Sequence, residues 1–219
     1  MTDELQSSRT TVERLADRAL YDFAAIAAIL DEGYVCHVGF VVNGQPYVIP
    51  TGYGREDRVL YLHGAAANRM LNAATGALPL CVSVTLVDGL VLARSAFHHS
   101  VNYRSVLLLG EAEKLDAHDK MHAMEVITNH IVPDRWRHLR QVHQGELDAT
   151  IVLRFPIIEG SAKVRGGPPK DDDEDYALPI WAGTLDIATA YSPVADPKLQ
   201  RELDLPEHVR QFLRPGKPK

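Results

Sequence analysis

The chain has 219 residues, of which 46% are hydrophobic, and a formal net charge of -6. This length and apolar content suit one domain with a proper core, and an acidic balance without any run of Lys and Arg argues against a nucleic-acid surface. The acidic start, Met1 to Gln6, differs from a signal peptide, and no apolar run is long enough to span a membrane, so we expect a cytoplasmic protein with no membrane partner. Cys36 and Cys81 lie apart in strand-like runs and are expected to be structural thiols.

The first predicted element is a helix near the N-terminus. Asp22 can cap it, because a carboxylate accepts hydrogen bonds from the free N–H groups of a first turn. Gly33 stands where the helix should end. The apolar residues between them follow the helical period: Phe23, Ile26, Ala27 and Leu30.

Beyond this helix the hydrophobic pattern changes to the two-residue period of β-strands. Residues 34–42 and 47–53 flank Asn43 and Gly44. This pair tolerates positive φ at both turn positions, which is typical of a tight hairpin. The pattern therefore predicts two antiparallel strands joined by a short turn.

The same reasoning predicts a second hairpin. Asp88 and Gly89 form another turn pair of this class, between the apolar runs 80–87 and 90–94. The next run, residues 103–113, is too uniformly apolar for a strand with one face in water. These strands are closely connected, which favours an antiparallel sheet.

A second long helix and two more strands complete the compact part. Asp116 can cap the helix and Pro133 lies just past its end, while residues 149–158 and 160–165 return to the strand pattern. The predicted inner face of the helix is Met121, Met124, Ile127 and Ile131. Hairpin-linked strands with inserted helices predict a mainly β fold, a closed or partly closed antiparallel barrel. The absence of a βαβ rhythm excludes a doubly wound dinucleotide-binding fold.

The chain divides into a barrel part with an N-terminal helix, residues 1–165, and a tail, residues 166–219. The tail begins with a Gly-Gly-Pro-Pro linker and an acidic block at residues 171–175, which is typical of a solvated segment. The apolar stretch 176–183 follows directly, and Pro206 can open a short final helix. Because so apolar a stretch needs a surface to cover, we expect the tail to wrap over the barrel or over a partner subunit.

Two places in the predicted barrel suit a ligand. The strand that ends at residues 62–64 runs into small residues before a predicted helix that carries Asn68 and Arg69. Small side chains let the backbone approach a ligand, N–H groups of a first turn face an anion, and a guanidinium can bind phosphate oxygens. The second place is the polar strand entrance at residues 102–105, and backbone amides of residues 49–52 could reach the same ligand.

Other chemistries lack their motifs in this sequence. His98 and His99 are neighbours on an extended chain, so their side chains point to opposite faces, and no metal site is expected. No serine lies in a nucleophile motif, and the acidic residues cluster in the solvated block rather than as a catalytic pair. A cofactor site is the hypothesis that remains.

Four short motifs occur in order between residues 12 and 165: Tyr47-Val48-Ile49-Pro50-Thr51, Leu60-Tyr61-Leu62-His63-Gly64 with Asn68-Arg69, Asn102-Tyr103-Arg104-Ser105-Val106 with Gly110, and Ser161-Ala162-Lys163. Together they resemble the pyridoxamine 5'-phosphate oxidase-like FMN-binding split-barrel proteins, and most closely the branch that includes the nitroimidazole-resistance reductases. The resemblance implies a six-stranded antiparallel split barrel of Greek-key type. It also implies a homodimer with FMN bound at the interface in two symmetric copies.

The resemblance assigns site residues by position. Leu62 and His63 match the strand end beside the flavin and its ribityl chain. Asn68 and Arg69 match the pair of basic residues on the phosphate, although Asn68 departs from the pattern and leaves one guanidinium. Ser105 matches the strand glutamine near the flavin ring. The remaining expected cofactor contacts are Pro50, Thr51, Tyr103, Arg104, Lys163 and Trp181, the last as the late aromatic residue that covers the flavin from the other subunit.

Several alternatives stay open at this point. His63 is the candidate catalytic residue or an interface hydrogen-bonding group, Arg104 could instead pair with an acid on a neighbouring strand, and Lys163 could be a solvated charge. The resemblance implies an FMN-dependent oxidoreductase for a small-molecule redox substrate such as a nitroaromatic or a quinone. The alternative is a non-catalytic flavin- or haem-binding protein of the same fold. The acidic tail lacks the basic cluster that a second phosphate would need, which disfavours pyridoxamine phosphate as the substrate.

Overall fold

The computed structural model describes residues 3–65, 76–199 and 203–212. The predicted helix that carries Asn68 and Arg69 lies outside these residues. In the part of the chain that is described, no helix is both long and apolar enough to cross a bilayer.

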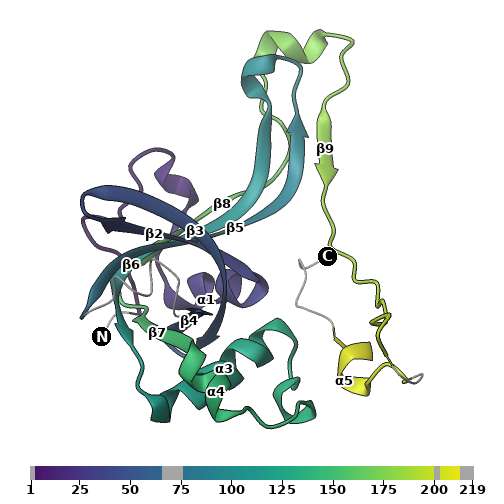
Figure 1. Cartoon of the computed structure of the whole chain (residues 1–219). Coiled ribbons are helices and arrows are strands. Elements are labelled where there is room, and N and C mark those ends of the chain that lie inside the picture. The colour runs from purple at the N-terminus through teal and green to yellow at the C-terminus, as the bar shows by residue number, and fades with distance from the viewer. Residues whose placement is uncertain (1–2, 66–75, 200–202, 213–219) are drawn as a thin grey trace.

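Six antiparallel strands form a ring, which confirms the predicted mainly β split barrel (Figure 1). In ring order they are β6 (Ser100–Lys114), β7 (Thr150–Pro156), β4 (Val59–Ala65), β3 (Gln45–Glu56), β2 (Val35–Val42) and β5 (Leu78–Leu92), and β5 pairs again with β6. The ring is not evenly closed. The β5–β6 ladder is long, whereas β6 and β7 share two residue pairs among the described residues, and β8 (Gly160–Arg165) with β1 (Ala19–Leu20) takes the remaining edge of β6.

The helix α1 (Phe23–Glu32) packs into the main core of this ring. As predicted, Asp22 caps the helix, accepting a hydrogen bond from the Ala25 N–H at 2.8 Å, and Gly33 ends it. Leu30 is fully buried, and its carbonyl accepts a hydrogen bond from the hydroxyl of the fully buried Tyr53. This bond satisfies the one polar group of a large aromatic side chain inside an otherwise apolar core.

The first predicted hairpin is confirmed and the second is wrong. Asn43 and Gly44 join β2 to β3 with φ angles of 51° and 79°, as a primed turn requires. Asp88 and Gly89 make no turn, because β5 continues through them as one strand with a bulge after Val87. Gly89 pairs with β6 on one side and with a strand of the tail on the other, so contacts distant in sequence override the local turn preference.

The helix α3 (Ala117–Ile131), capped by Asp116 as predicted, packs on the outside of the barrel. A Cβ atom on Gly54 would lie 2.6 Å from the Cα atom of Ile127, so a glycine is what lets the helix approach β3. The helix and the barrel share a small second core: Tyr61, Ala123, Ile127 and Val152. The predicted inner face is wrong at its two ends, where Met121 and Ile131 are exposed, because the helix contacts the sheet mainly at its middle.

An arm, residues 87–102 and 166–187, projects from the barrel (Figure 1). It contains the distal ends of β5 and β6, the short helices η2 (Ala96–His98) and η4 (Asp173–Ala177), and the strand β9 (Gly183–Asp186), which pairs with β5. The backbone N–H and guanidinium of Arg94 donate to the Asp171 carboxylate at 2.8 and 2.9 Å. This ion pair holds the start of the acidic block against the end of β5. The sequence predicted a solvated segment at this block.

The chain returns from the arm to the barrel after β9. The Tyr191 hydroxyl is hydrogen-bonded to that of Tyr34, and the ring of Tyr191 contacts the ring of Phe212. The short helix α5 (Glu207–Arg210) follows Pro206, as predicted, and lies near η3 (Trp136–His138), which connects α3 to α4 (Gln144–Ala149). The tail therefore contacts the barrel at the start of β2 and beyond the end of α3.

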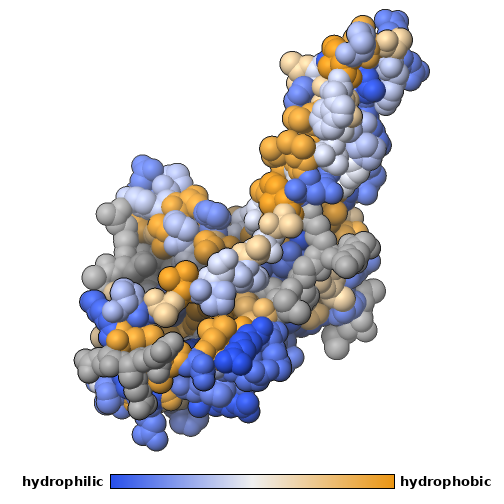
Figure 2. Space-filling view, turned by 90° about the vertical axis from the view of Figure 1, so that its right-hand side faces the viewer, coloured by the Kyte–Doolittle hydropathy of each residue, from blue (hydrophilic) through white to orange (hydrophobic). Residues whose placement is uncertain are grey.

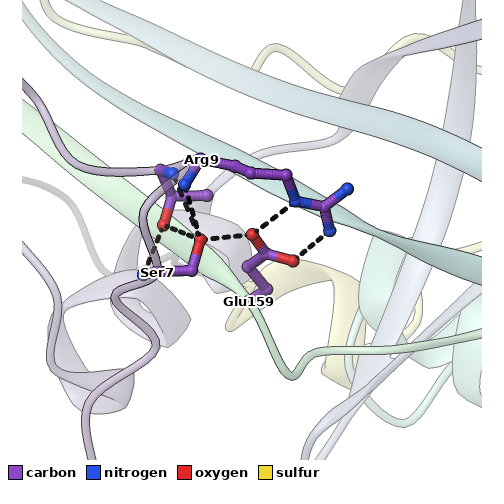
Figure 3. Close-up of polar contacts among 4 residues, drawn as sticks. Ser7, Arg9 and Glu159 are labelled. Atoms are coloured by element: carbon purple, nitrogen blue, oxygen red, sulfur yellow. Dashed lines mark hydrogen bonds and ion pairs between the residues drawn. The ribbon is translucent and has the colours of Figure 1, made fainter.

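The N-terminal segment is fixed to the turn between β7 and β8 by polar contacts (Figure 3). The guanidinium of Arg9 forms a two-pronged ion pair with Glu159, whose carboxylate also accepts a hydrogen bond from the Ser7 hydroxyl. These bonds, from Arg9 first, hold the pKa of Glu159 below its usual value. Nearby, the Gly160 N–H donates to the Leu5 carbonyl, so Leu5 enters the main core.

Candidate functional site

The strands β2, β3, β5 and β6 have an uncharged outer face. It consists of the odd-numbered residues of 35–41, 81–87 and 103–109 and the even-numbered residues of 46–50, which the strand register places on one side of the sheet. None of these fifteen positions carries Asp, Glu, Lys or Arg, although 24% of the chain is charged. Val48 is 68% exposed and Val41 is 59% exposed. An apolar sheet face that remains open in the single chain is typical of a surface that another molecule covers.

Three predicted cofactor residues lie on this outer face. Pro50 is exposed on β3, beside His37 of β2, and Tyr103 and Ser105 are half-buried on β6. The structure thus places side chains from two separate sequence motifs on one surface. Thr51 alternates to the other side, where its hydroxyl donates to the Gly52 carbonyl at 3.2 Å.

The predicted strand end of β4 lies at a corner of the barrel. Residues 45–52 of β3 pair with β2, and residues 53–56 pair with β4, so the two partner strands separate between Gly52 and Tyr53. Leu62 is fully buried in the main core. His63 points to the opposite side and is exposed. Desolvation by surrounding protein atoms holds the pKa of His63 below its usual value, which favours a neutral imidazole that can accept a proton or a hydrogen bond.

Arg104 binds two carboxylates on the inner side of the sheet. Its guanidinium donates to Asp88 at 3.0 and 2.9 Å and to Glu32 at 2.8 Å. The hydrogen bonds that Arg104 donates to Glu32, and then those it donates to Asp88, raise the pKa of Arg104. Arg104 therefore pairs with an acid on a neighbouring strand, because Asp88 belongs to β5. This is one of the two alternatives that the sequence left open. The pair also explains why Asp88 sits in a bulge and not in a turn.

Two predicted cofactor residues, Ser105 and Lys163, form hydrogen bonds within the protein, and a third, Trp181, lies on the arm. The Ser105 hydroxyl donates to the Lys163 carbonyl at 3.4 Å, and the Lys163 ammonium donates to the Arg14 carbonyl at 2.8 Å. Trp181 is 66% exposed on the arm, where its ring lies against Gly183. Asn68 and Arg69 fall outside the described residues.

Sequence reasoning missed a histidine in the tail. His208 of α5 stacks in parallel on His138, with ring centroids 4.0 Å apart, and both of its ring nitrogens are buried without a hydrogen-bond partner in the part of the chain that the structure describes. Burial, followed by the charge of His138, lowers the pKa of His208. No pattern in the sequence marks this residue, because its surroundings come from a contact between the tail and η3.

The tail and the barrel enclose a largely apolar pocket of about 730 Å³ next to α5. Tyr34 and Val132 line it from the barrel, and Tyr191, Val209 and Phe212 line it from the tail. Val209 directly follows His208 in α5. A pocket of this size and character is typical of sites for small organic molecules.

The model of the pyridoxamine 5'-phosphate oxidase family matches residues 22–164, so the chain belongs to this family. The matched segment runs from the cap of α1 to the end of β8 and contains the whole six-stranded ring. The family predicted from the sequence motifs is therefore confirmed. No curated protein matches the chain.

Solved structures extend the similarity beyond the matched segment. The flavocytochrome Anf3 from Azotobacter vinelandii is 42% identical, with a TM-score of 0.88, over 96% of this chain and 99% of that chain. The FAD and haem binding protein from Mycobacterium smegmatis is 33% identical, with a TM-score of 0.85, over 89% and 97%. A protein described as a 5-nitroimidazole antibiotic resistance protein, from Bacteroides thetaiotaomicron, is 25% identical, with a TM-score of 0.55, over 67% and 86%. The first two similarities include the arm and the tail.

Proposed function

We propose that this protein is a homodimeric redox protein that binds a flavin and a haem. The observation that carries the proposal is the uncharged outer face, which is open in the single chain and holds three of the predicted cofactor residues. A flat apolar ring system and the same face of a second copy are both suited to cover it. The two relatives that align with nearly the whole chain, described as a flavocytochrome and as an FAD and haem binding protein, support both cofactors.

The flavin would lie against the outer face, near Pro50, Tyr103 and Ser105, with His63 at the neighbouring corner. We propose FAD as this flavin, because the relative at 33% identity is described as an FAD binder, whereas the motifs resemble FMN-binding proteins. His63 is the group placed to exchange a proton there, since its lowered pKa leaves it neutral near pH 7. Trp181 would contact the partner subunit's flavin from the arm.

The haem would lie in the pocket between the tail and the barrel, and the imidazole of His208, which adjoins this pocket through Val209 without lining it, would hold its iron. A neutral imidazole nitrogen is a common ligand of haem iron, and the two buried nitrogens of His208 have no hydrogen-bond partner among the described residues. Apolar side chains such as Val132 and Phe212 would exclude water from this pocket. When bound, the two cofactors supply redox chemistry, so the protein would pass electrons between a small-molecule substrate, such as a quinone or a nitroaromatic, and the haem.

Absorption spectroscopy of the purified protein tests the cofactors directly. The proposal predicts both a flavin band and a Soret band, with mass spectrometry of the released flavin identifying FAD. A flavin band without a Soret band would overturn the haem half of the proposal. A colourless protein that neither flavin nor haem reconstitutes would overturn all of it.

A pair of variants tests the haem ligand. His208→Ala should lose the Soret band and keep the flavin band, because the two sites lie on different parts of the chain. His118→Ala is the matched control, since the His118 side chain is exposed on α3 and is hydrogen-bonded only to Asp119 among the described residues. A Soret band that is equally strong in both variants would move the ligand to another residue.

A further inference from the structure

A basic pocket of about 480 Å³ lies between η1 (Ala16–Arg18), η2 of the arm and the chain that follows β8. Four of its lining side chains are cations, Arg14, Arg18, Arg165 and Lys170, and one is an acid, Asp17. The whole chain has a net charge of -6, so this local excess of positive charge opposes the overall balance. The predicted cofactor residues that the structure describes do not line this pocket.

Arg165 is the buried member of this group. It is 9% exposed, and its guanidinium donates to the side-chain oxygen of Asn102, a neutral amide. Asn102 in turn donates to the Gly167 carbonyl at 3.1 Å, which fixes its orientation. Burial lowers the pKa of Arg165, and the nearby Arg18 lowers it further. No carboxylate among the described residues forms an ion pair with either arginine.

Three other partly buried arginines of this protein are neutralised. Arg55 binds Asp31, Arg94 binds Asp171, and Arg104 binds two acids, although these three residues are half-buried whereas Arg165 is buried. A buried charge without a counter-ion is costly, and Arg165 lacks among the described residues the carboxylate partner that each of these three arginines has. The omission indicates that an anion from outside the chain completes the pocket.

We propose that the basic pocket binds the phosphate groups of a nucleotide. One guanidinium group can bind two phosphate oxygens at once, and the pocket is lined by three arginines. Phe97 of η2 lines the same pocket and is 90% exposed, so its ring is available to stack on a base. A phosphorylated molecule with an aromatic ring matches both features better than a simple anion does.

Two nucleotides share this chemistry. Tyr103 of the outer face pairs across the strands with Arg165, so the pocket adjoins the proposed flavin surface and is placed to hold the adenosine diphosphate part of FAD. That source rests on the proposed function. A diffusible nicotinamide dinucleotide, as an electron donor, would bind in the same way without any flavin.

Calorimetric titration of the purified protein with ADP, and separately with inorganic pyrophosphate, tests the proposal. Arg18→Gln should weaken ADP binding at least tenfold, whereas the control Arg137→Gln, which removes the same charge from an exposed arginine of η3, should not. Arg18 is half-buried and has no ion pair among the described residues, so this variant should fold; Arg165→Gln should have the larger effect if it folds.

Retention of the flavin distinguishes the two sources. If FAD occupies the pocket, ADP binds poorly to the purified protein, and Arg18→Gln retains FAD worse than the control while binding FMN equally well. If the pocket takes a diffusible nucleotide, ADP binds to the purified protein and competes with the nicotinamide dinucleotide. The proposal is overturned if ADP and pyrophosphate do not bind and FAD retention is the same in Arg18→Gln and Arg137→Gln. A protein without flavin would refute the flavin assignment and leave the ADP titration decisive for the pocket.

Discussion

The two sides of the barrel strands have similar polarity and opposite exposure. On the inner side, side chains such as Val38, Val82 and Leu108 are fully buried in one core, and Arg104 is neutralised by two acids. On the outer side, the residues of β2, β3, β5 and β6 carry no charge at all and remain open, with Val48 68% exposed. The inner side is complete within one chain, and the outer side is not. The difference indicates which half of the sheet stabilises the fold and which half is kept for another molecule.

The arm continues the open side. In Figure 2 apolar side chains follow the arm down toward its base, and the exposed apolar residues there include Leu90, Trp181 and Leu185. The β5–β9 pairing keeps Leu90 and Leu185 opposite each other on a sheet that projects away from the barrel. We therefore expect the arm to contact the partner subunit in the proposed dimer.

The largest expected effect comes from placing a charge on the outer face. Val48→Arg should convert the proposed dimer to a monomer that retains no flavin, because a buried, unpaired guanidinium would oppose both contacts. Light scattering and the absorption spectrum measure the two losses, and circular dichroism should show an unchanged fold. Ile158→Arg is the control, since Ile158 is 70% exposed outside this face. The interpretation of the face fails if both variants remain dimeric and yellow.

A truncation on the inner side should act on stability alone. Leu62→Ala removes a fully buried side chain and should lower the free energy of unfolding by about 2–5 kcal/mol, measured in urea. Leu60→Ala, in the same strand and core, should cost a similar amount. Neither should change flavin affinity at native conditions. A selective loss of flavin in Leu62→Ala would show that this side chain reaches the ligand after all.

The ion pairs of Arg104 should make a smaller contribution. Arg104→Met leaves Glu32 and Asp88 without their partner and should destabilise the fold by about 1–3 kcal/mol, the scale of a partly buried charged hydrogen bond. Its flavin content should equal that of the unmodified protein. Adding Glu32→Gln and Asp88→Asn should recover part of the stability. A variant that is fully stable but lacks flavin would return Arg104 to the cofactor site.

The smallest expected effect is at the N-terminal contact of Figure 3. The folded-state pKa of Glu159 lies below its unfolded value, so its ion pair stabilises the fold above about pH 4 and loses this effect as the pH falls through the folded pKa. Glu159→Gln should therefore lower Tm slightly at pH 7, and its melting curve should converge with that of the unmodified protein in acid. Glu113→Gln, at an exposed position of β6, is the control. A difference that grows in acid would contradict this account.

Local sequence signals located most of the elements, and long-range contacts decided the rest. The Asp22 cap and the Asn43-Gly44 turn were predictable because short-range backbone geometry determines them. Asp88 and Gly89 carry the same turn signal but lie within one strand, since β9, 95 residues further along the chain, adds a third strand beside them. That pairing has no local signature.

The same limit applies to the site. Pro50, Tyr103 and Ser105 lie on one side of the sheet. The alternation of side chains along each strand could not show this by itself, because the register between the strands was also needed. Arg104 and Arg165 look alike in the sequence as strand arginines, and the structure separates them by their partners, two carboxylates for one and an amide for the other. His208 has no signal at all, because its neighbour His138 is 70 residues away. Function therefore depends on contacts that composition and spacing do not encode.

The most direct test of the central claim is light scattering on the purified protein together with its absorption spectrum. If the outer face is shared by a second copy and a flavin, the particle should have twice the mass of one 24.3 kDa chain and carry bound flavin. A colourless monomer that stays monomeric when flavin is added would contradict the claim, because the uncharged face would then remain open to water.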